Sequence, residues 1–270
     1  MKRKISILTL ASLAVACSSI NLSLAQLPAP NEAGVTMGHL HMVTPNVEAT
    51  KKVFATMGGI VTKREGAADI VKFPGVLVFF REGEPTGPTV GSVVNHIGFL
   101  VPNTQQAIAK WKAAGLNAAP GAANRSDQGF VTTPEGVRIE ILEDKAQTVP
   151  IRSHHTHFNV AESAIPEIQA WYAKFFGAKP GMRGQNQAAD VPGMNLTFSR
   201  SAEPTVPTRN RALDHIGFEV KNLEAFCKKL EASGIKLDRA YGKTATGLGI
   251  AFVTDPWGTY IELNEGLDKL

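Results

Sequence analysis

The chain has 270 residues, of which 43% are hydrophobic and 19% charged, a composition typical of a globular protein with one large or two small domains. Its net charge is +4, and the basic residues are scattered, with no run rich in lysine and arginine outside the extreme N-terminus. Such a distribution argues against a nucleic-acid-binding surface. We also expect no stable membrane span.

The first 25 residues have the pattern of a secretory signal. Lys2-Arg3-Lys4 precedes a short apolar run from Ile5 to Ala16, and Ser23-Leu24-Ala25 offers small residues for cleavage. An alternative is a lipoprotein signal that anchors the protein at Cys17. Cleavage after Ala25 predicts a secreted or periplasmic protein with Cys227 as its one cysteine, which we expect to be buried in a helix.

Four segments alternate apolar with polar or small residues and carry histidine in register. Two are close copies, Asn95-His96-Ile97-Gly98-Phe99 and Asp214-His215-Ile216-Gly217-Phe218. Two are weaker, His39-Leu40-His41 and His155-Thr156-His157. The alternation predicts half-buried strands, and the recurrence predicts four copies of one unit.

Each of these strands is followed by a helical pattern that ends near glycine and then by short strands. The predicted helices are Val47–Met57, Thr104–Ala114, Ile165–Phe176 and Leu223–Ser233. We therefore expect an α+β fold of four β-α-β-β-β modules in two paired halves, residues 34–145 and 150–266, after a signal peptide at residues 1–25. Trp111, Trp171 and Tyr172 fall at helical spacing and are expected in the core.

Two glutamates lie in the apolar last strands of the second and fourth modules. Glu140 and Glu262 each follow a Pro-x-Gly turn and are flanked by branched apolar residues. A buried carboxylate is costly unless another charge offsets it, and a metal ion held with histidines would do so. The proposed ligands form one triad per half: His39, His96 and Glu140, and then His155, His215 and Glu262. Two imidazoles and a carboxylate suit Fe, Mn, Ni, Co or Zn.

His-Ile-Gly-Phe and Pro-x-Gly-x-x-x-Glu, each present twice, resemble motifs of the vicinal-oxygen-chelate superfamily, which includes glyoxalase I, bleomycin- and fosfomycin-resistance proteins and extradiol dioxygenases. The resemblance implies the glyoxalase/bleomycin resistance/dihydroxybiphenyl dioxygenase-like fold. It also implies a divalent metal held by the six residues named above and a substrate that chelates it through two oxygens.

Three departures from these relatives bear on the activity. An extradiol dioxygenase would have tyrosine at Phe252 and a histidine shortly before it, but residues 243–249 contain none. A fourth glyoxalase ligand would fall at Phe79 or Thr197, and neither is a good ligand.

The sequence favours a metal-dependent enzyme of glyoxalase type, a lyase or isomerase acting on a small molecule. A ring-cleaving dioxygenase is the first alternative, and a metal-free ligand-binding module of the bleomycin-resistance kind is the second. His41 and His157 share a strand face with the ligand candidates; they could orient a ligand, act as general base or simply pack. The catalytic and substrate-binding residues are otherwise not predicted, and a homodimer is left open.

Overall fold

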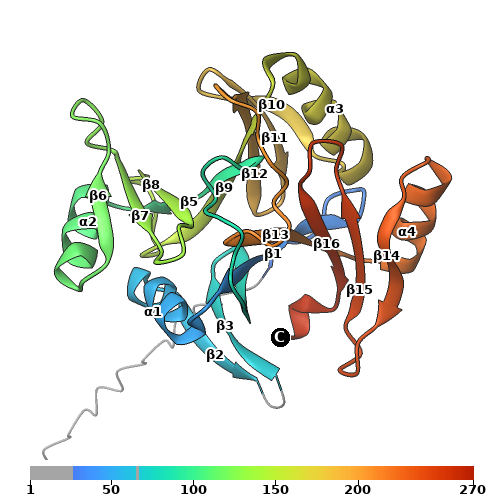
Figure 1. The fold of residues 1–270 in the computed structure, drawn as a ribbon, viewed down its shortest axis with the longest axis horizontal. Coiled ribbons are helices and arrows are strands. Elements are labelled where there is room, and N and C mark those ends of the chain that lie inside the picture. Colours follow the sequence, from blue (N-terminus) through green and yellow to red (C-terminus); the bar gives the residue numbers. More distant parts are fainter. Residues whose placement is uncertain (1–26, 65–66) are drawn as a thin grey trace, which may run out of the picture.

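The computed structural model describes residues 27–64 and 67–270, and they form an α+β fold of four units with one order of elements (Figure 1). Each unit runs strand, helix, three strands. The first two units comprise β1 (Val35–Thr44), α1 (Val47–Met57), β2 (Ile60–Arg64), β3 (Ala67–Phe73) and β4 (Val76–Glu82), then β5 (Val94–Val101), α2 (Thr104–Ala113), β6 (Asn117–Pro120), β7 (Gln128–Thr132) and β8 (Arg138–Glu143).

The third and fourth units repeat this order. They comprise β9 (Arg152–Val160), the short 3-10 helix η1 (Glu162–Ala164), α3 (Ile165–Phe176), β10 (Lys179–Arg183), β11 (Asn186–Val191) and β12 (Met194–Arg200), then β13 (Leu213–Val220), α4 (Leu223–Ala232), β14 (Leu237–Lys243), β15 (Gly249–Thr254), β16 (Tyr260–Glu265) and the 3-10 helix η2 (Leu267–Lys269). The predicted α+β fold class is confirmed.

Local sequence explains where the helices begin and end. Asn46 accepts a hydrogen bond from the amide of Ala49 and so caps α1, as Asn103 and Asn222 cap α2 and α4. Gly58 ends α1 with a φ of 116°, a left-handed conformation that suits glycine. The predicted helices therefore agree with the observed ones to within one residue at each end.

The strands form two sheets of eight, and each sheet joins two units. One sheet has the order β14-β15-β16-β13-β1-β4-β3-β2 and the other β10-β11-β12-β9-β5-β8-β7-β6. The units meet through antiparallel pairs of first strands, β1 with β13 and β5 with β9. The first unit thus pairs with the fourth and the second with the third, so each half of the chain contributes one unit to each sheet.

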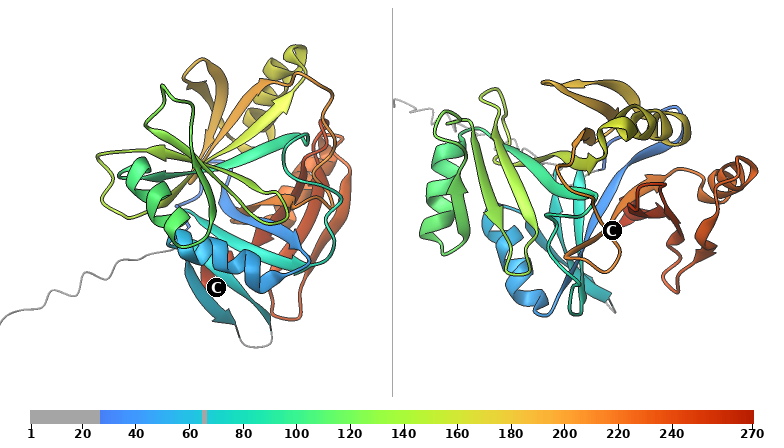
Figure 2. Two further views of the ribbon diagram at one scale, coloured as in Figure 1. Left: turned by 60° about the vertical axis from the view of Figure 1, so that its left-hand side comes forward. Right: turned by 45° about the horizontal axis from the view of Figure 1, so that its top comes forward.

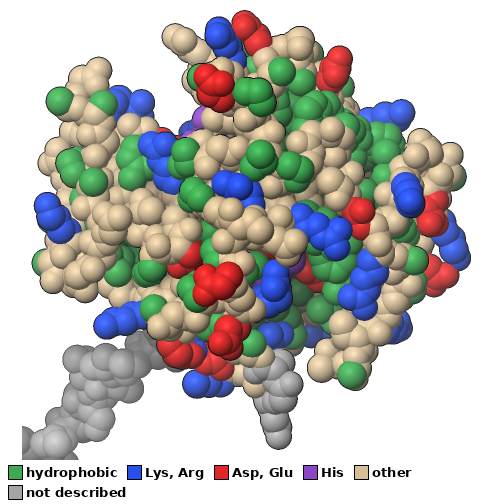
Figure 3. Space-filling view, in the orientation of Figure 1, with side chains coloured by type: hydrophobic (Ala, Val, Ile, Leu, Met, Phe, Trp, Pro, Cys, Tyr) green, Lys and Arg blue, Asp and Glu red, His purple; other side chains and the backbone are tan. Residues whose placement is uncertain are grey.

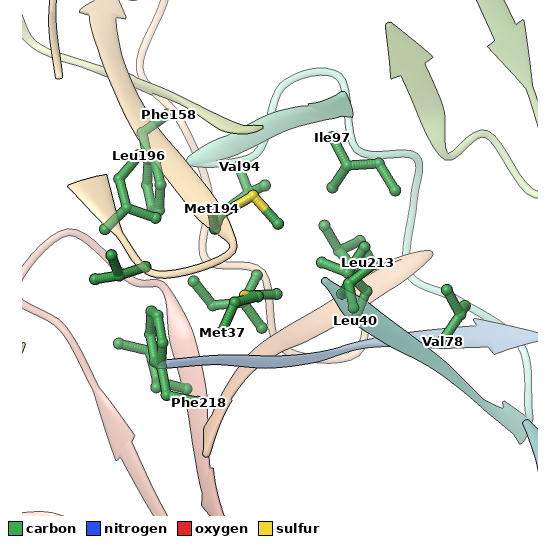
Figure 4. Close-up of a cluster of buried hydrophobic side chains, with 14 of the residues drawn as sticks. Met37, Leu40, Val78, Val94, Ile97, Phe158, Met194, Leu196, Leu213 and Phe218 are labelled. Atoms are coloured by element: carbon green, nitrogen blue, oxygen red, sulfur yellow. The ribbon is translucent and has the colours of Figure 1, made fainter. Parts of the chain in front are cut away.

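The two sheets pack against each other through a continuous apolar core. Leu40 and Leu213 from one sheet and Ile97 and Phe158 from the other are buried in one cluster (Figure 4). Along β1 the apolar Leu40 alternates with His39 and His41, so the histidines lie on the opposite face of the strand from this core. The helices lie towards the outside of the molecule, and the first strands run near its centre (Figures 1 and 2).

Two equivalent turns tie the sheets together. The carbonyl of Pro192, at the turn between β11 and β12, accepts a hydrogen bond from the amide of Met37 in β1 at 2.9 Å. The carbonyl of Pro74, at the turn between β3 and β4, accepts one from the amide of Ser153 in β9 at 3.1 Å. Each odd-numbered unit therefore reaches across to the first strand of the other sheet.

The described residues include no helix long and apolar enough to cross a membrane. The predicted signal peptide and Cys17 lie at residues 1–26, outside the described residues. Cys227 is buried in α4, as expected, and burial raises the pKa of its thiol to about 11. The three aromatic residues expected in the core, Trp111, Trp171 and Tyr172, are all buried.

Candidate metal centres

The six predicted metal ligands gather in two groups, one on each sheet. His39, His215 and Glu262 meet on the first sheet, where His41 joins them, and we call this set the Glu262 site. His96, His155 and Glu140 meet on the second sheet, where His157 joins them, and we call this set the Glu140 site.

The predicted division of these residues into two triads was wrong. Each of the four histidines does face one of the two glutamates, as expected. Each site takes its first histidine from one half of the chain and its second from the other, because β1 pairs with β13 and β5 with β9. His96 and His215 occupy equivalent positions in equivalent strands. The sequence pattern is therefore the same whichever first strands pair, and it does not fix the partner.

Both sites have one carboxylate oxygen facing two imidazoles. In the Glu262 site, Oε2 of Glu262 lies 2.8 Å from Nε2 of His215 and 3.3 Å from Nε2 of His39. In the Glu140 site, Oε2 of Glu140 lies 3.0 Å from Nε2 of His155 and 3.4 Å from Nε2 of His96. Ligands about 2.1 Å from a common ion are separated by about 3 to 4 Å. Three of these four distances lie in that range and the one between Glu262 and His215 lies just below it, so the side chains are placed to share a metal.

The second oxygen of each glutamate is held by a side-chain amide. Nδ2 of Asn264 donates to Oε1 of Glu262 at 2.7 Å, and Nε2 of Gln128 donates to Oε1 of Glu140. Each carboxylate is thus oriented to present a single oxygen to the imidazoles, which is how a monodentate ligand is positioned.

A glycine on the facing strand makes room for one histidine in each site. A Cβ on Gly217 would lie 2.1 Å from the imidazole of His39, and a Cβ on Gly98 would lie 1.9 Å from that of His155. The glycine of His-Ile-Gly-Phe is therefore required by the close approach of the partner strand's imidazole.

Several buried polar atoms at the sites have no hydrogen-bond partner. They are both ring nitrogens of His39 and of His41, Nε2 of His96 and of His155, and Oε2 of Glu140. Buried polar atoms are normally satisfied, so an unpaired set that converges on one point fits a bound cation. The residues present therefore fit the divalent metal that the sequence predicts.

For four of the histidines, the electrostatics favour a neutral imidazole beside an ionised carboxylate. Burial lowers the pKa of His39 and His96, and lowers that of His41 and His155 further, so these rings are unprotonated near neutral pH. Burial would raise the pKa of both glutamates, but the facing histidines hold the pKa of Glu140 and of Glu262 well below the usual range. Neutral imidazole and ionised carboxylate are the forms that bind metals.

The equivalent histidines His215 and His96 differ in what holds the ring nitrogen that faces away from the glutamate. Nδ1 of His215 lies 2.5 Å from Oδ1 of Asp214, whereas Nδ1 of His96 lies 2.9 Å from Oδ1 of the uncharged Asn95. Burial would lower the pKa of His215, but hydrogen bonds to Asp214 and Glu262 raise it. A carboxylate behind a ligating histidine fixes its orientation and strengthens it as a donor, which favours the Glu262 site.

His41 and His157 occupy equivalent places but have different partners. Nδ1 of His157 faces Nη2 of Arg183 at 3.3 Å, and its Nε2 lies 2.7 Å from Oγ of Ser199. Because arginine only donates, Nδ1 of His157 accepts and Nε2–H donates to the serine. Both nitrogens of His157 are therefore engaged, whereas His41 has both nitrogens free of hydrogen-bond partners.

Four contributors to the sites were not predicted. Asn264 lies two residues after Glu262 on the same strand face, so strand alternation contained a signal for it. Asp214 adjoins a predicted ligand. Gln128 and Arg183 lie far in sequence from the residues that they contact, and β10, which carries Arg183, was not predicted as a strand.

The face drawn in Figure 3 shows histidine only in small areas, in keeping with the burial of the ligand candidates.

Aromatic residues line the Glu262 site. Phe79, Phe252 and Tyr260 surround the imidazoles of the Glu262 site, with ring centroids 4.8 Å from His39, 5.5 Å from His215 and 5.7 Å from His215, respectively.

Comparison with known proteins agrees with this architecture. Residues 154–263 match the family described as Glyoxalase/Bleomycin resistance protein/Dioxygenase superfamily. A search of curated protein sequences found no match to the chain.

Solved structures share the fold at low sequence identity. Glyoxalase I from Zea mays is 14% identical with a TM-score of 0.68, covering 87% of this chain and 94% of its own. A protein from Bacillus subtilis that carries the provisional name dioxygenase is 11% identical with a TM-score of 0.61, covering 89% and 86%. These likenesses establish the fold of the whole described chain.

The matched segment runs from within β9 to within β16 and so supplies ligand candidates to both sites. The family match over residues 154–263 and the shared fold both agree with the resemblance of the sequence motifs to the vicinal-oxygen-chelate superfamily.

Proposed function

We propose that the protein is a divalent-metal-dependent enzyme of glyoxalase type, a lyase or isomerase that acts on a small molecule with adjacent oxygens. The observation that carries the proposal is the paired set of imidazoles around one oriented carboxylate oxygen, with buried nitrogens that have no other partner. When bound, the metal would act as a Lewis acid on a substrate oxygen.

The chain's own groups divide the remaining work. His39, His215 and Glu262 would hold the metal in one site, and His96, His155 and Glu140 in the other. His41 is the candidate for proton transfer, because its imidazole is unprotonated and has no hydrogen-bond partner, and its ring centroid lies 4.5 Å from that of His215.

Metal content is the first test. We expect about two metal equivalents in the mature chain, expressed without residues 1–25, and one equivalent in Glu262→Ala or Glu140→Ala. Mass spectrometry of each protein after anaerobic purification measures this. Equal metal content in the wild type and the double variant would refute metal binding at both sites and favour a metal-free ligand-binding module.

Proton exchange is the second test. The metal-loaded protein is expected to accelerate hydrogen–deuterium exchange at the carbon next to the carbonyl of hydroxyacetone, measured by NMR in deuterated water. His41→Ala should retain its metal and lose about 10²–10⁴-fold in exchange rate, the usual contribution of a general base. Loss of metal in this variant would instead make His41 a ligand.

The aromatic lining of the Glu262 site favours one alternative, a ring-cleaving dioxygenase. Phe79, Phe252 and Tyr260 would suit an aromatic substrate, and two histidines with a carboxylate suit Fe(II). Oxygen consumption by the iron-loaded protein with catechol would support this alternative.

We also propose that the protein is exported, with cleavage after Ala25. The support is the basic start of the chain, the apolar run after it and the small residues before Gln26. N-terminal sequencing of the mature protein tests this, and a lipid-modified Cys17 would establish the lipoprotein alternative.

A further inference from the structure

We propose that Arg183 makes the Glu140 site selective for a carboxylate-bearing substrate, whereas the Glu262 site has no such preference. This inference rests on the proposed function, because it requires a divalent metal in the Glu140 site. It names the class of substrate that this site would take.

Arg183 reaches into the Glu140 site from the end of β10. Its Nε donates to Oγ1 of Thr197 at 2.7 Å, and its Nη2 lies 3.3 Å from Nδ1 of His157 and 3.9 Å from Oε2 of Glu140. That oxygen is also the one that faces the imidazoles. A carboxylate bound to the metal could therefore also contact the guanidinium.

The charged side chains closest to the two glutamates differ. Glu140 has two cations near it, Arg183 and Arg138, whose guanidinium stacks on Phe130 on the same side of the sheet as Glu140. Glu262 instead shares its site with a second carboxylate, Asp214, which the half-exposed Arg81 approaches at 3.7 Å. A divalent ion would thus leave the Glu140 site clearly cationic, and an anionic ligand would be drawn to it.

Two equivalent residues, Thr197 and Phe79, explain why Arg183 reaches its site and Arg64 does not. Thr197 is paired with His157 in the sheet register, and Phe79 is paired with His41 in the same way. Arg64 ends β2 as Arg183 ends β10.

Phe79 is close to both its arginine and an imidazole of the Glu262 site. The guanidinium carbon of Arg64 is 5.1 Å from the ring centroid of Phe79, which is itself 4.8 Å from that of His39. Thr197 is small and accepts a hydrogen bond from Arg183 instead, so that guanidinium passes beside it to the metal centre.

The ligand that fits is a small 2-hydroxy or 2-oxo acid. Two adjacent oxygens would bind the metal, and the remaining carboxylate oxygen would accept hydrogen bonds from Arg183. Such charge-assisted hydrogen bonds are short and strong, and arginine presents a planar pair of donors for them. Lactate is a suitable probe. Hydroxyacetone is an uncharged comparison that also carries a hydroxyl and a carbonyl oxygen on adjacent carbons.

The test uses the mature chain loaded with Co(II) in a His39→Ala background, so that the Glu140 site reports alone. Lactate and hydroxyacetone are titrated by calorimetry and by the visible absorption of the cobalt. We expect Arg183→Met to weaken lactate binding at least about tenfold, with hydroxyacetone binding and metal content unchanged. Arg183→Lys should retain part of the affinity.

Two further variants separate this role from a structural one. Thr197→Phe should weaken lactate binding as Arg183→Met does, because the ring would displace the guanidinium. Arg64→Met, at the equivalent position in the other sheet, should leave lactate binding unchanged.

Lactate affinity that is unaffected in Arg183→Met, with cobalt retained, would overturn this inference and leave the proposed function standing. Failure of the unmutated chain to take up cobalt would instead refute the proposed function, and this inference with it.

Discussion

At the scale of single residues, the glycine of each His-Ile-Gly-Phe segment decides whether the partner strand's histidine can occupy its place. We expect Gly217→Ala to displace His39, because the new Cβ would lie 2.1 Å from its ring. Metal affinity of the Glu262 site should fall at least about tenfold, while the Glu140 site keeps its metal. Metal titration of the purified variant measures both.

Gly98→Ala provides the matched control, because it faces His155 and should affect only the Glu140 site. Loss of metal from the same site in both variants would contradict this assignment. Unchanged metal content in both would show that the imidazoles can move aside at little cost.

The amides that orient the two glutamates give a second prediction at this scale. Asn264→Leu removes the donor to Oε1 of Glu262 and frees the carboxylate to rotate. Loss of such an outer contact typically lowers metal affinity about 10–100-fold. Competition with a chromogenic chelator should show this loss for one of the two metal equivalents, and a loss from neither would mean that the strand alone positions Glu262.

At the scale of elements, Glu219 links β13 to the C-terminal helix η2. Its carboxylate accepts hydrogen bonds from the amides of Gly266 and Leu267, and burial, with Asp268 and Glu265 nearby, raises its pKa to about 7. Between about pH 4.5 and 7 the unfolded chain releases this proton while the folded chain keeps it. The folded state then binds more protons, so this group lowers stability as pH rises through that window.

Glu219→Gln should remove this dependence, because the amide is uncharged at every pH and its oxygen can still accept from the backbone. We expect wild-type stability to fall relative to the variant between pH 5 and pH 7.5. Urea unfolding at a series of pH values, with chelator present throughout, measures the difference. Parallel stability curves would show that the carboxyl titrates normally.

The same scale shows which elements could be predicted from the sequence. The helices were found because asparagine caps and glycine stops bound an apolar periodicity, and the inner strands because they alternate. The strands β6, β10 and β14 were missed. They are sheet-edge strands with mostly exposed residues, such as the segment Lys179–Arg183, and have no buried face to impose a period of two.

At the scale of the whole molecule, the sequence identified the six ligand candidates but not how they combine. The repeated strand motifs show that His96 and His215 occupy equivalent positions, and that Glu140 and Glu262 do so as well. Pairing β1 with β13 instead of β5 depends on how the units pack in three dimensions. The core between the sheets and the reciprocal contacts of Pro74 and Pro192 belong to that packing, and neither leaves a local pattern.

Neither half of the chain contains a complete sheet, because each sheet joins one unit from each half. Each half carries one unit of each sheet, so residues 27–145 alone would expose the edges of β1 and β5 that normally pair with β13 and β9. Unpaired strand edges invite association with another chain. We therefore expect this fragment to form no folded monomer and to self-associate.

Coexpression of residues 27–145 with residues 146–270 should instead give a complex that copurifies, binds metal at both sites and unfolds in one transition. The cut falls in an exposed connection at Lys145 and Ala146, so it removes no strand. Size-exclusion chromatography and calorimetry distinguish the outcomes. A monomeric fragment with a sharp unfolding transition of its own would mean that each half is an independent domain and that the pairing of sheets across halves adds little to stability.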